Sequence, residues 1–89
     1  MPAEPCQHLA ALTSLTTAAE YACVDCVLLG DAWVHLRVCQ DCGLVGCCDN
    51  SKNQHATQHF RVAQHPVIAS AEPGEQWLWC YLHEESAEY

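Results

Sequence analysis

The sequence predicts a small α+β domain held together by zinc, with a twisted, mainly antiparallel sheet and one main helix. Three observations predict this fold. The chain has 89 residues, a length at which a hydrophobic core alone is marginal. It contains eight cysteines and six histidines, many at the spacings of metal ligands. Segments that alternate apolar and polar residues flank a segment with two histidines four residues apart, as expected for strands around a helix.

The cysteine content has two explanations: a disulfide framework in a secreted protein, or zinc sites in a reducing compartment. The first residues, MPAEPCQH, lack the basic and apolar regions of a signal peptide. The histidines also lie at ligand-like spacings from the cysteines. We therefore favour zinc over disulfides and expect a cytoplasmic protein. No apolar run is long enough to predict a membrane span, which needs about 18 residues or more.

The charge of the chain narrows its possible partners. Three basic residues, Arg37, Lys52 and Arg61, stand against eleven acidic ones, for a formal net charge of −8. Nucleic-acid phosphates are bound mainly by lysine and arginine, so the composition excludes a nucleic-acid-binding domain. An acidic surface favours a neutral or basic partner.

The chain divides into a loose lead-in over residues 1–5, a domain over residues 6–83 and an acidic, frayed tail over residues 84–89. Within the domain, the predicted elements are a possible N-terminal helix over residues 9–20, strands over 33–38 and about 44–48, a main helix over about 53–64, and strands over 66–70 and 77–82. The main helix ends before Pro66, which cannot continue it.

Alternation assigns side chains to the two faces of the sheet. The residues expected to share a face are Val34, Leu36 and Val38 in one strand and Leu78, Cys80 and Leu82 in another. Because Cys80 must face its metal, its neighbours Trp79 and Tyr81 point to the opposite face, together with Trp77. Trp33 and Phe60 are expected in the core, since so small a domain needs large hydrophobic side chains between its metal sites.

Structural zinc binds four ligands, cysteine thiolates or neutral histidines, in a closed tetrahedron. His35 is left out because it is placed within a strand, and only one of the adjacent Cys47 and Cys48 is counted. Seven cysteines and five histidines then remain, enough for three full sites. With Cys47 taken from its pair, the candidate ligands are Cys6, His8, Cys23, Cys26, Cys39, Cys42, Cys47, His55, His59, His65, Cys80 and His83. Spacing alone does not say which of them share a site.

The motifs, read together, resemble a known family. In order they are C-x-H-L, C-x-x-C, W-x-x-L-R-x-C-x-x-C-G-x-V-x-C, H-A-x-x-H-F-x-x-x-x-H-P-V and W-x-W-C-Y. This order is similar to that of the UBP-type zinc finger, the ubiquitin-binding zinc finger of many deubiquitinases and one histone deacetylase. The resemblance runs from Cys6 to His83 and is closest to the small stand-alone bacterial members.

The resemblance implies three interleaved zinc sites. The implied groups are Cys6, His8, Cys80 and His83; Cys23, Cys26, Cys47 and His55; and Cys39, Cys42, His59 and His65. Counting forward from Cys42 favours Cys47 in the second group. Counting back from His55 favours Cys48, and we choose Cys47.

This chain ends its motif in Cys80-x-x-His83, where the commonest family pattern has C-x-x-C. Histidine is an equally good zinc ligand, so the implied site remains complete.

The resemblance also implies a binding groove. In the family, aromatic residues beside the last cysteine line a pocket for a free C-terminal Gly-Gly tail, which carries over to Trp79 and Tyr81. In ubiquitin binders an arginine two places after the middle cysteine contacts the terminal carboxylate, but that place holds Asp49 here. An aspartate repels a carboxylate, so Lys52 or Arg61 would have to substitute. We therefore expect a different peptide end, such as one with a basic residue, or another protein surface, rather than ubiquitin.

The leading hypothesis is a monomeric, non-enzymatic module with three structural zinc ions that binds a peptide or protein C-terminus on its aromatic groove. Three alternatives stay open. One is a zinc-stabilised scaffold without a pocket, and another is a redox- or metal-responsive protein that uses the extra thiol of Cys48. The third is a zinc hydrolase, which would need His83 to leave a coordination position open for water. The metal-free protein is expected to be unfolded.

Overall fold

A five-stranded antiparallel sheet forms the centre of the molecule. The computed structural model describes residues 7–10 and 15–88, so the predicted lead-in over residues 1–5 lies outside the described part. The strands follow the order β2-β1-β3-β4-β5, and every neighbouring pair is antiparallel. Their bounds are β1 Leu36–Cys39, β2 Val45–Cys47, β3 Val67–Ser70, β4 Trp77–Cys80 and β5 Glu85–Glu88. The predicted α+β fold is confirmed.

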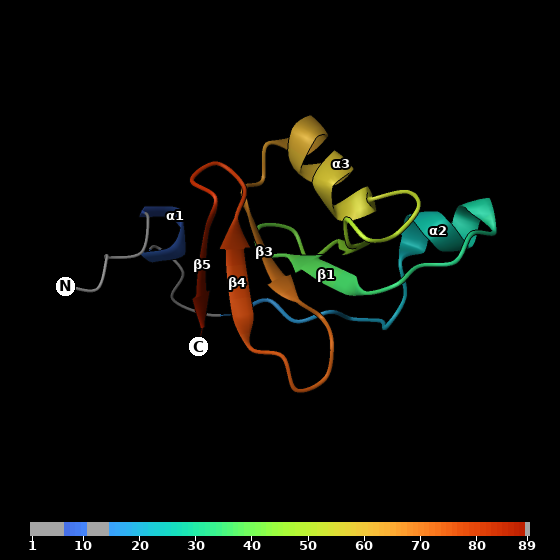
Figure 1. The fold of residues 1–89 in the computed structure, drawn as a ribbon, viewed down its shortest axis with the longest axis horizontal. Coiled ribbons are helices and arrows are strands. Elements are labelled where there is room, and N and C mark those ends of the chain that lie inside the picture. Colours follow the sequence, from blue (N-terminus) through green and yellow to red (C-terminus); the bar gives the residue numbers. More distant parts are fainter. Residues whose placement is uncertain (1–6, 11–14, 89) are drawn as a thin grey trace.

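Three helices accompany the sheet in the described residues: α1 (Gln7–Ala10), α2 (Val24–Leu29) and α3 (His55–Ala63). α1 and α2 lie at opposite ends of the molecule, and α3 packs on β1 and β2 (Figure 1). None of the three is long and apolar enough to cross a membrane. α3 is the predicted main helix, although it begins only at His55 because the backbone of Gln54 is left-handed (φ 50°).

The two faces of the sheet have different roles. Most of the hydrophobic core lies on one face, which is formed by Leu36, Val38, Val45, Val67, Ala69 and Leu78 together with several cysteines. The register places Arg37 beside Ser70, and Ile68 beside Trp79, on the other face. α3 covers the β2 end of this second face. The part of the face that carries Arg37 and Trp79 is not covered by α3 and forms a groove.

Two residues expected on the inner face are exposed instead. Val34 is 52% and Leu82 is 56% exposed. β1 begins only at Leu36 and β4 ends at Cys80, so neither residue lies in a strand and the alternation does not reach them. Trp33 is half-buried against the core, in agreement with its expected place.

The predicted helix over residues 9–20 is wrong for residues 15–20, which are not helical; residues 11–14 lie outside the described part. A long-range contact explains the non-helical backbone there. The buried Gln40 side chain accepts a hydrogen bond from the backbone N–H of Thr16 at 2.8 Å and donates one to its carbonyl at 2.9 Å. These bonds replace those that a helix would make within the segment.

The expectation of a frayed acidic tail is wrong for Glu85–Glu88, which form β5. The strand pairs with β4 along its whole length, from Trp77 with Glu88 to Cys80 with Glu85. Ala87 packs against the core. β4 would otherwise leave a row of backbone groups unpaired at the sheet edge, and β5 satisfies them despite its weak strand-forming composition.

Gly46 allows α3 to approach the sheet closely. A Cβ added at Gly46 would lie 2.7 Å from the backbone N and 3.0 Å from the Cα of Ala56, which no side-chain rotation can relieve. The same contact places His55, the first residue of α3, beside Cys47. Glycine at position 46 is therefore needed for both the packing of α3 and the position of His55.

Gly46→Ala is expected to destabilise the protein by about 3 kcal/mol, because overpacking against backbone has no cheap relaxation. For a domain of this size that corresponds to a fall of roughly 12–24 °C in Tm. Thermal unfolding followed by circular dichroism measures it. The control is Gly30→Ala, where the added Cβ meets nothing within 4 Å and only the positive φ of 75° opposes the substitution. Equal shifts for the two variants would contradict the close-contact argument.

Candidate metal centres and aromatic groove

The first group of ligand atoms comes from three separate elements. Cys23 and Cys26 are the N-cap residue and third residue of α2, Cys47 ends β2 and His55 begins α3. All four side chains are buried, and their ligand atoms lie within 4.8 Å of one another. His55 Nδ1 is 3.2 Å from Cys23 Sγ, 3.4 Å from Cys26 Sγ and 3.6 Å from Cys47 Sγ. The structure thus places Cys47, and not Cys48, in this group.

The surroundings of this group favour thiolate ligands bound to a cation. The backbone N–H of His55, at the start of α3, donates to Cys47 Sγ at 3.2 Å, and Asn53 donates its side-chain N–H to Cys26 Sγ at 3.6 Å. Among protein groups alone, burial raises the pKa of the Cys23 thiol to about 12. A bound dication supplies the opposite charge that lowers such a pKa and keeps the sulfurs ionised.

The second group consists of Cys39, Cys42, His59 and His65. The two cysteines lie on a tight turn that ends at Gly43, which has φ 80° and donates its N–H to the carbonyl of Cys39 at 2.8 Å, as expected for a zinc knuckle. The histidines come from α3 and from the segment before β3. Cys42 Sγ lies 3.3 Å from His59 Nε2, and Cys39 Sγ lies 3.6 Å from His65 Nδ1.

Burial also shifts the pKa values of two residues in this second group. It raises the pKa of the Cys39 thiol and, together with the neighbouring His65, lowers the pKa of His59. The histidine is therefore held neutral, which is the form that binds a metal.

The third group joins the beginning of the described chain to its end. His8 comes from α1, Cys80 ends β4, and His83 lies in the turn before β5. Cys80 Sγ is 3.4 Å from His8 Nδ1 and 3.6 Å from His83 Nδ1, and the two Nδ1 atoms are 3.3 Å apart. The fourth expected ligand, Cys6, lies outside the described residues.

The distances within the groups match tetrahedral zinc. With ordinary zinc bond lengths, such a site separates two sulfurs by about 3.8 Å, sulfur and nitrogen by about 3.6 Å, and two nitrogens by about 3.3 Å. The sulfurs of Cys26 and Cys47 are 3.8 Å apart, the sulfur–nitrogen distances quoted above run from 3.2 to 3.6 Å, and His59 Nε2 lies 3.3 Å from His65 Nδ1. A disulfide would need sulfurs about 2.05 Å apart. The geometry therefore fits metal sites and not a disulfide framework.

Of the cysteines and histidines that the structure describes, His35 and Cys48 lie outside these groups. His35 is exposed at the start of the first strand region. Cys48 is buried, with its Sγ 3.6 Å from the hydroxyl oxygen of Ser51. Burial alone would raise the pKa of Cys48, but the Ser51 hydroxyl and the Asn50 backbone outweigh it, and the pKa is lowered.

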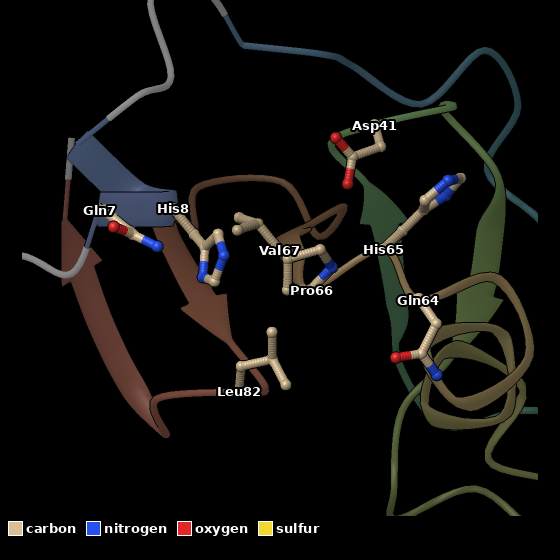
Figure 2. A pocket seen from close by; sticks show the side chains of 8 residues that line it. All are labelled: Gln7, His8, Asp41, Gln64, His65, Pro66, Val67 and Leu82. Carbon is tan, nitrogen blue, oxygen red and sulfur yellow. The ribbon is translucent and has the colours of Figure 1, made fainter.

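A pocket of about 930 Å³ lies between the second and third groups. Figure 2 shows His8 and His65 on opposite sides of it, with Pro66 and Val67 between them. Both histidines belong to ligand groups, and the other polar side chains that line this pocket are Gln7, Asp41 and Gln64.

A second pocket, of about 350 Å³, is the aromatic groove. Its walls include Trp77, Trp79 and Tyr81, which alternate with core residues along β4 and the turn after it. They point away from the metal group of Cys80, as the alternation predicted. Phe60 of α3, half-buried, stacks on Tyr81 with ring centroids 4.6 Å apart and fixes this end of the groove.

Asp49 lies at the groove, as the resemblance implied. Its carboxylate Oδ1 accepts a hydrogen bond from the hydroxyl of Thr57, and that hydroxyl oxygen lies 3.2 Å from the hydroxyl oxygen of Tyr81. Burial, followed by the charge of Asp49, raises the pKa of the Tyr81 phenol, which therefore stays neutral. Asp49 and Tyr81 are thus linked through Thr57.

Sequence reasoning missed the basic residue of the groove. Arg37, and neither Lys52 nor Arg61, lines it. The Arg37 guanidinium lies over the ring of Trp77, with Cζ 4.6 Å from the ring centroid. The alternation along β1 carried the signal, because it places Arg37 on the face opposite Leu36 and Val38, which is the face of the aromatic residues.

Comparison with known proteins agrees with this site. The family model described as the zinc finger in ubiquitin hydrolases and other proteins matches residues 16–88. The chain is 39% identical over 59 residues to mouse ubiquitin carboxyl-terminal hydrolase 45, and 36% identical over 63 residues to the human protein. These matches cover 62% and 66% of this chain but only 6% and 7% of the two hydrolases.

A solved structure is similar over nearly the whole chain. The solution NMR structure of protein RPA1320 from Rhodopseudomonas palustris has a TM-score of 0.84 and is 41% identical, covering 98% of this chain and 84% of that one. Residues 16–88, which the family model matches, include the whole of the first and second ligand groups and the groove. The chain belongs to the UBP-type zinc fingers, the family of zinc fingers found in ubiquitin hydrolases and other proteins.

Proposed function

We propose that this protein is a non-enzymatic binding module in which three structural zinc ions hold a groove that takes the C-terminal end of a peptide or protein. The first two groups each supply four ligands, and His8, Cys80 and His83, with Cys6 as the expected fourth, supply the third. A structural site filled by four protein ligands has no position for catalytic water. The zinc ions therefore support the fold, and the protein works by binding.

The observation that carries this proposal is the aromatic groove on the face of β4 opposite its metal group. Its volume, about 350 Å³, suits a few residues of extended chain. Trp79 and Tyr81 are half-buried, so they leave ring surface open to a ligand. Flat ring faces accept a peptide backbone best where its side chains are small, as at a chain end rich in glycine or alanine.

Trp79→Ala is expected to weaken binding of a free peptide C-terminus by at least about thirtyfold, the usual effect of removing a central tryptophan. Isothermal titration calorimetry with short peptides that differ in their last residues measures the affinity, and zinc content checks the fold. Tyr21→Ala is the control, because Tyr21 is an exposed aromatic residue outside the groove. A correctly folded wild-type protein that binds no free C-terminus at any peptide concentration tested would contradict the proposed function.

A further inference from the structure

We propose that the groove selects a peptide C-terminus that also carries a positively charged side chain, with Arg37 binding the terminal carboxylate and Asp49 binding the cation. This inference rests on the proposed function and specifies its ligand. In the family, the arginine that binds the terminal carboxylate lies two places after the middle cysteine. In this chain that position holds Asp49, and the carboxylate-binding arginine comes from β1 instead.

Arg37 has hydrogen-bonding capacity that the described residues leave unused. Its side chain is only 16% exposed, and it lines the groove. Nη1 donates to the carbonyl of Leu36 at 3.0 Å, whereas Nε and Nη2 make no hydrogen bond with the described part of the chain. A largely buried guanidinium is costly unless it is paired. A carboxylate that entered the groove would supply the missing acceptors.

Glu75 does not fill this role. Its Oε1 lies 3.9 Å from Arg37 Nη1, beyond hydrogen-bond distance, and the same oxygen already accepts the hydroxyl hydrogen of Ser70. The Ser70 bond, and then the charge of Arg37, lower the pKa of Glu75, which is therefore ionised at neutral pH. Its side chain is 44% exposed and lies outside the groove, so the pair is weak and screened by salt.

Asp49 provides the opposite charge. Its Oδ1 is held by Thr57, while its Oδ2 accepts no hydrogen bond from the described residues. The side chain is exposed and lines the groove. A carboxylate fixed on one oxygen and open on the other is suited to a lysine or arginine side chain of the ligand. It also repels a terminal carboxylate, which directs that group to Arg37.

The two charges lie toward opposite ends of the row of rings. Arg37 lies over Trp77, and Asp49 is connected through Thr57 to Tyr81. Trp77 and Tyr81 are four residues apart along β4 and its continuation, about 13 Å at the rise of an extended strand. An extended ligand has the same rise per residue, so the positively charged residue is expected within the last four residues of the ligand.

The test uses N-acetylated alanine pentapeptides with one lysine placed in turn at each of the last four positions. Each is made as the free acid and as the C-terminal amide, and an all-alanine peptide serves as the reference. Wild type is expected to bind the free acids at least about tenfold more tightly than the amides, because the amide removes a charge-assisted pair. At the best lysine position, affinity is expected to rise about tenfold over all-alanine.

Two variants separate the two roles. Arg37→Gln is expected to remove the preference for acid over amide and to keep the lysine preference. Asp49→Asn is expected to do the reverse. Arg37→Lys keeps the charge and is expected to recover part of the acid preference. Zinc content and Tm, measured for each variant, detect a purely structural effect, which would lower affinity for acid and amide peptides equally.

The outcomes distinguish this inference from the proposed function. If Arg37→Gln keeps the full acid preference, or if wild type does not distinguish acid from amide, the assignment of Arg37 is wrong while the binding groove stands. If Asp49→Asn keeps the lysine preference, or wild type shows none, the assignment of Asp49 is wrong. If wild type binds none of the peptides and no other free C-terminus, the proposed function fails, and this inference fails with it.

Discussion

A chelator that removes all zinc is expected to unfold the whole domain. The largest fully buried side chains of the described residues show why: they are Leu36 and five cysteines, Cys23, Cys26, Cys39, Cys47 and Cys80. All five cysteines belong to the ligand groups. The centre of the described structure is therefore built largely from metal ligands, with Leu36 and a few smaller aliphatic side chains such as Val38 beside them. Without the metal, too little apolar surface remains to offset the conformational entropy of the chain.

The magnitudes support complete unfolding. A structural zinc ion contributes roughly 10 kcal/mol or more at neutral pH, whereas whole domains have net stabilities of about 5–15 kcal/mol. Burial raises the pKa of Cys23 to about 12 and also raises that of Cys39, so these thiols take up protons when the metal leaves. No charged pairs then remain to hold the groups together.

Circular dichroism and tryptophan fluorescence measure the loss of structure, and native mass spectrometry counts the ions before and after chelation. Readdition of zinc, but not of magnesium, is expected to restore both signals, because sulfur and imidazole ligands suit zinc and not a hard cation. A native-like spectrum after verified removal of every ion would show that the hydrophobic core suffices on its own.

Local sequence patterns predicted the elements around the second metal group. The pair Cys39 and Cys42, the glycine after them, and the ligands His59 of α3 and His65 just after it lie within 27 residues, so their contacts are set by one strand, one turn and one helix. The partners of Cys23 and Cys26 could not be read in this way. Their site is completed by the end of β2 and the start of α3. Spacing along a chain does not specify such contacts, and the family resemblance supplied the grouping.

The features that sequence reasoning missed depend on contacts between distant segments. Residues 15–20 are not helical, because Gln40 binds the backbone of Thr16. β5 forms because β4 offers it an unpaired edge. α2 gave no amphipathic signal, since Val27, Leu28 and Leu29 are all exposed, although the left-handed Gly30 that ends it is a recognisable helix stop.

Arg37 was missed at the groove for a different reason. Lys52 and Arg61 were the basic residues expected to substitute for the arginine, and neither lines the groove. The groove is formed across strands, where Arg37 of β1 lies beside Ser70 of β3 and stacks on Trp77 of β4. Alternation along β1 places Arg37 on the face opposite Leu36 and Val38, but strand order is needed to place it beside the rings.

The adjacent cysteines at positions 47 and 48 provide a matched pair of variants with very different expected effects. Cys47→Ser removes a fully buried sulfur that lies 3.8 Å from Cys26 Sγ and 3.6 Å from His55 Nδ1. Because a structural site contributes roughly 10 kcal/mol, the loss of one of its ligands is expected to cost on the order of 5 kcal/mol. Native mass spectrometry is expected to find two zinc ions in place of three, with a large fall in Tm.

Cys48→Ser makes the same chemical change one residue later and is expected to keep three zinc ions. Cys48 is buried, but its sulfur interacts with the Ser51 hydroxyl and the Asn50 backbone and lies in none of the ligand groups. A cost of about 1 kcal/mol is expected, typical of a buried substitution that creates neither a large cavity nor an unpaired charge. The strands alternate, so Cys47 and Cys48 cannot both point to the metal. If Cys48→Ser lost the ion and Cys47→Ser kept it, the register of β2 against β1 would have to shift by one residue, and the inward positions of Val45 and Cys47 would be wrong with it.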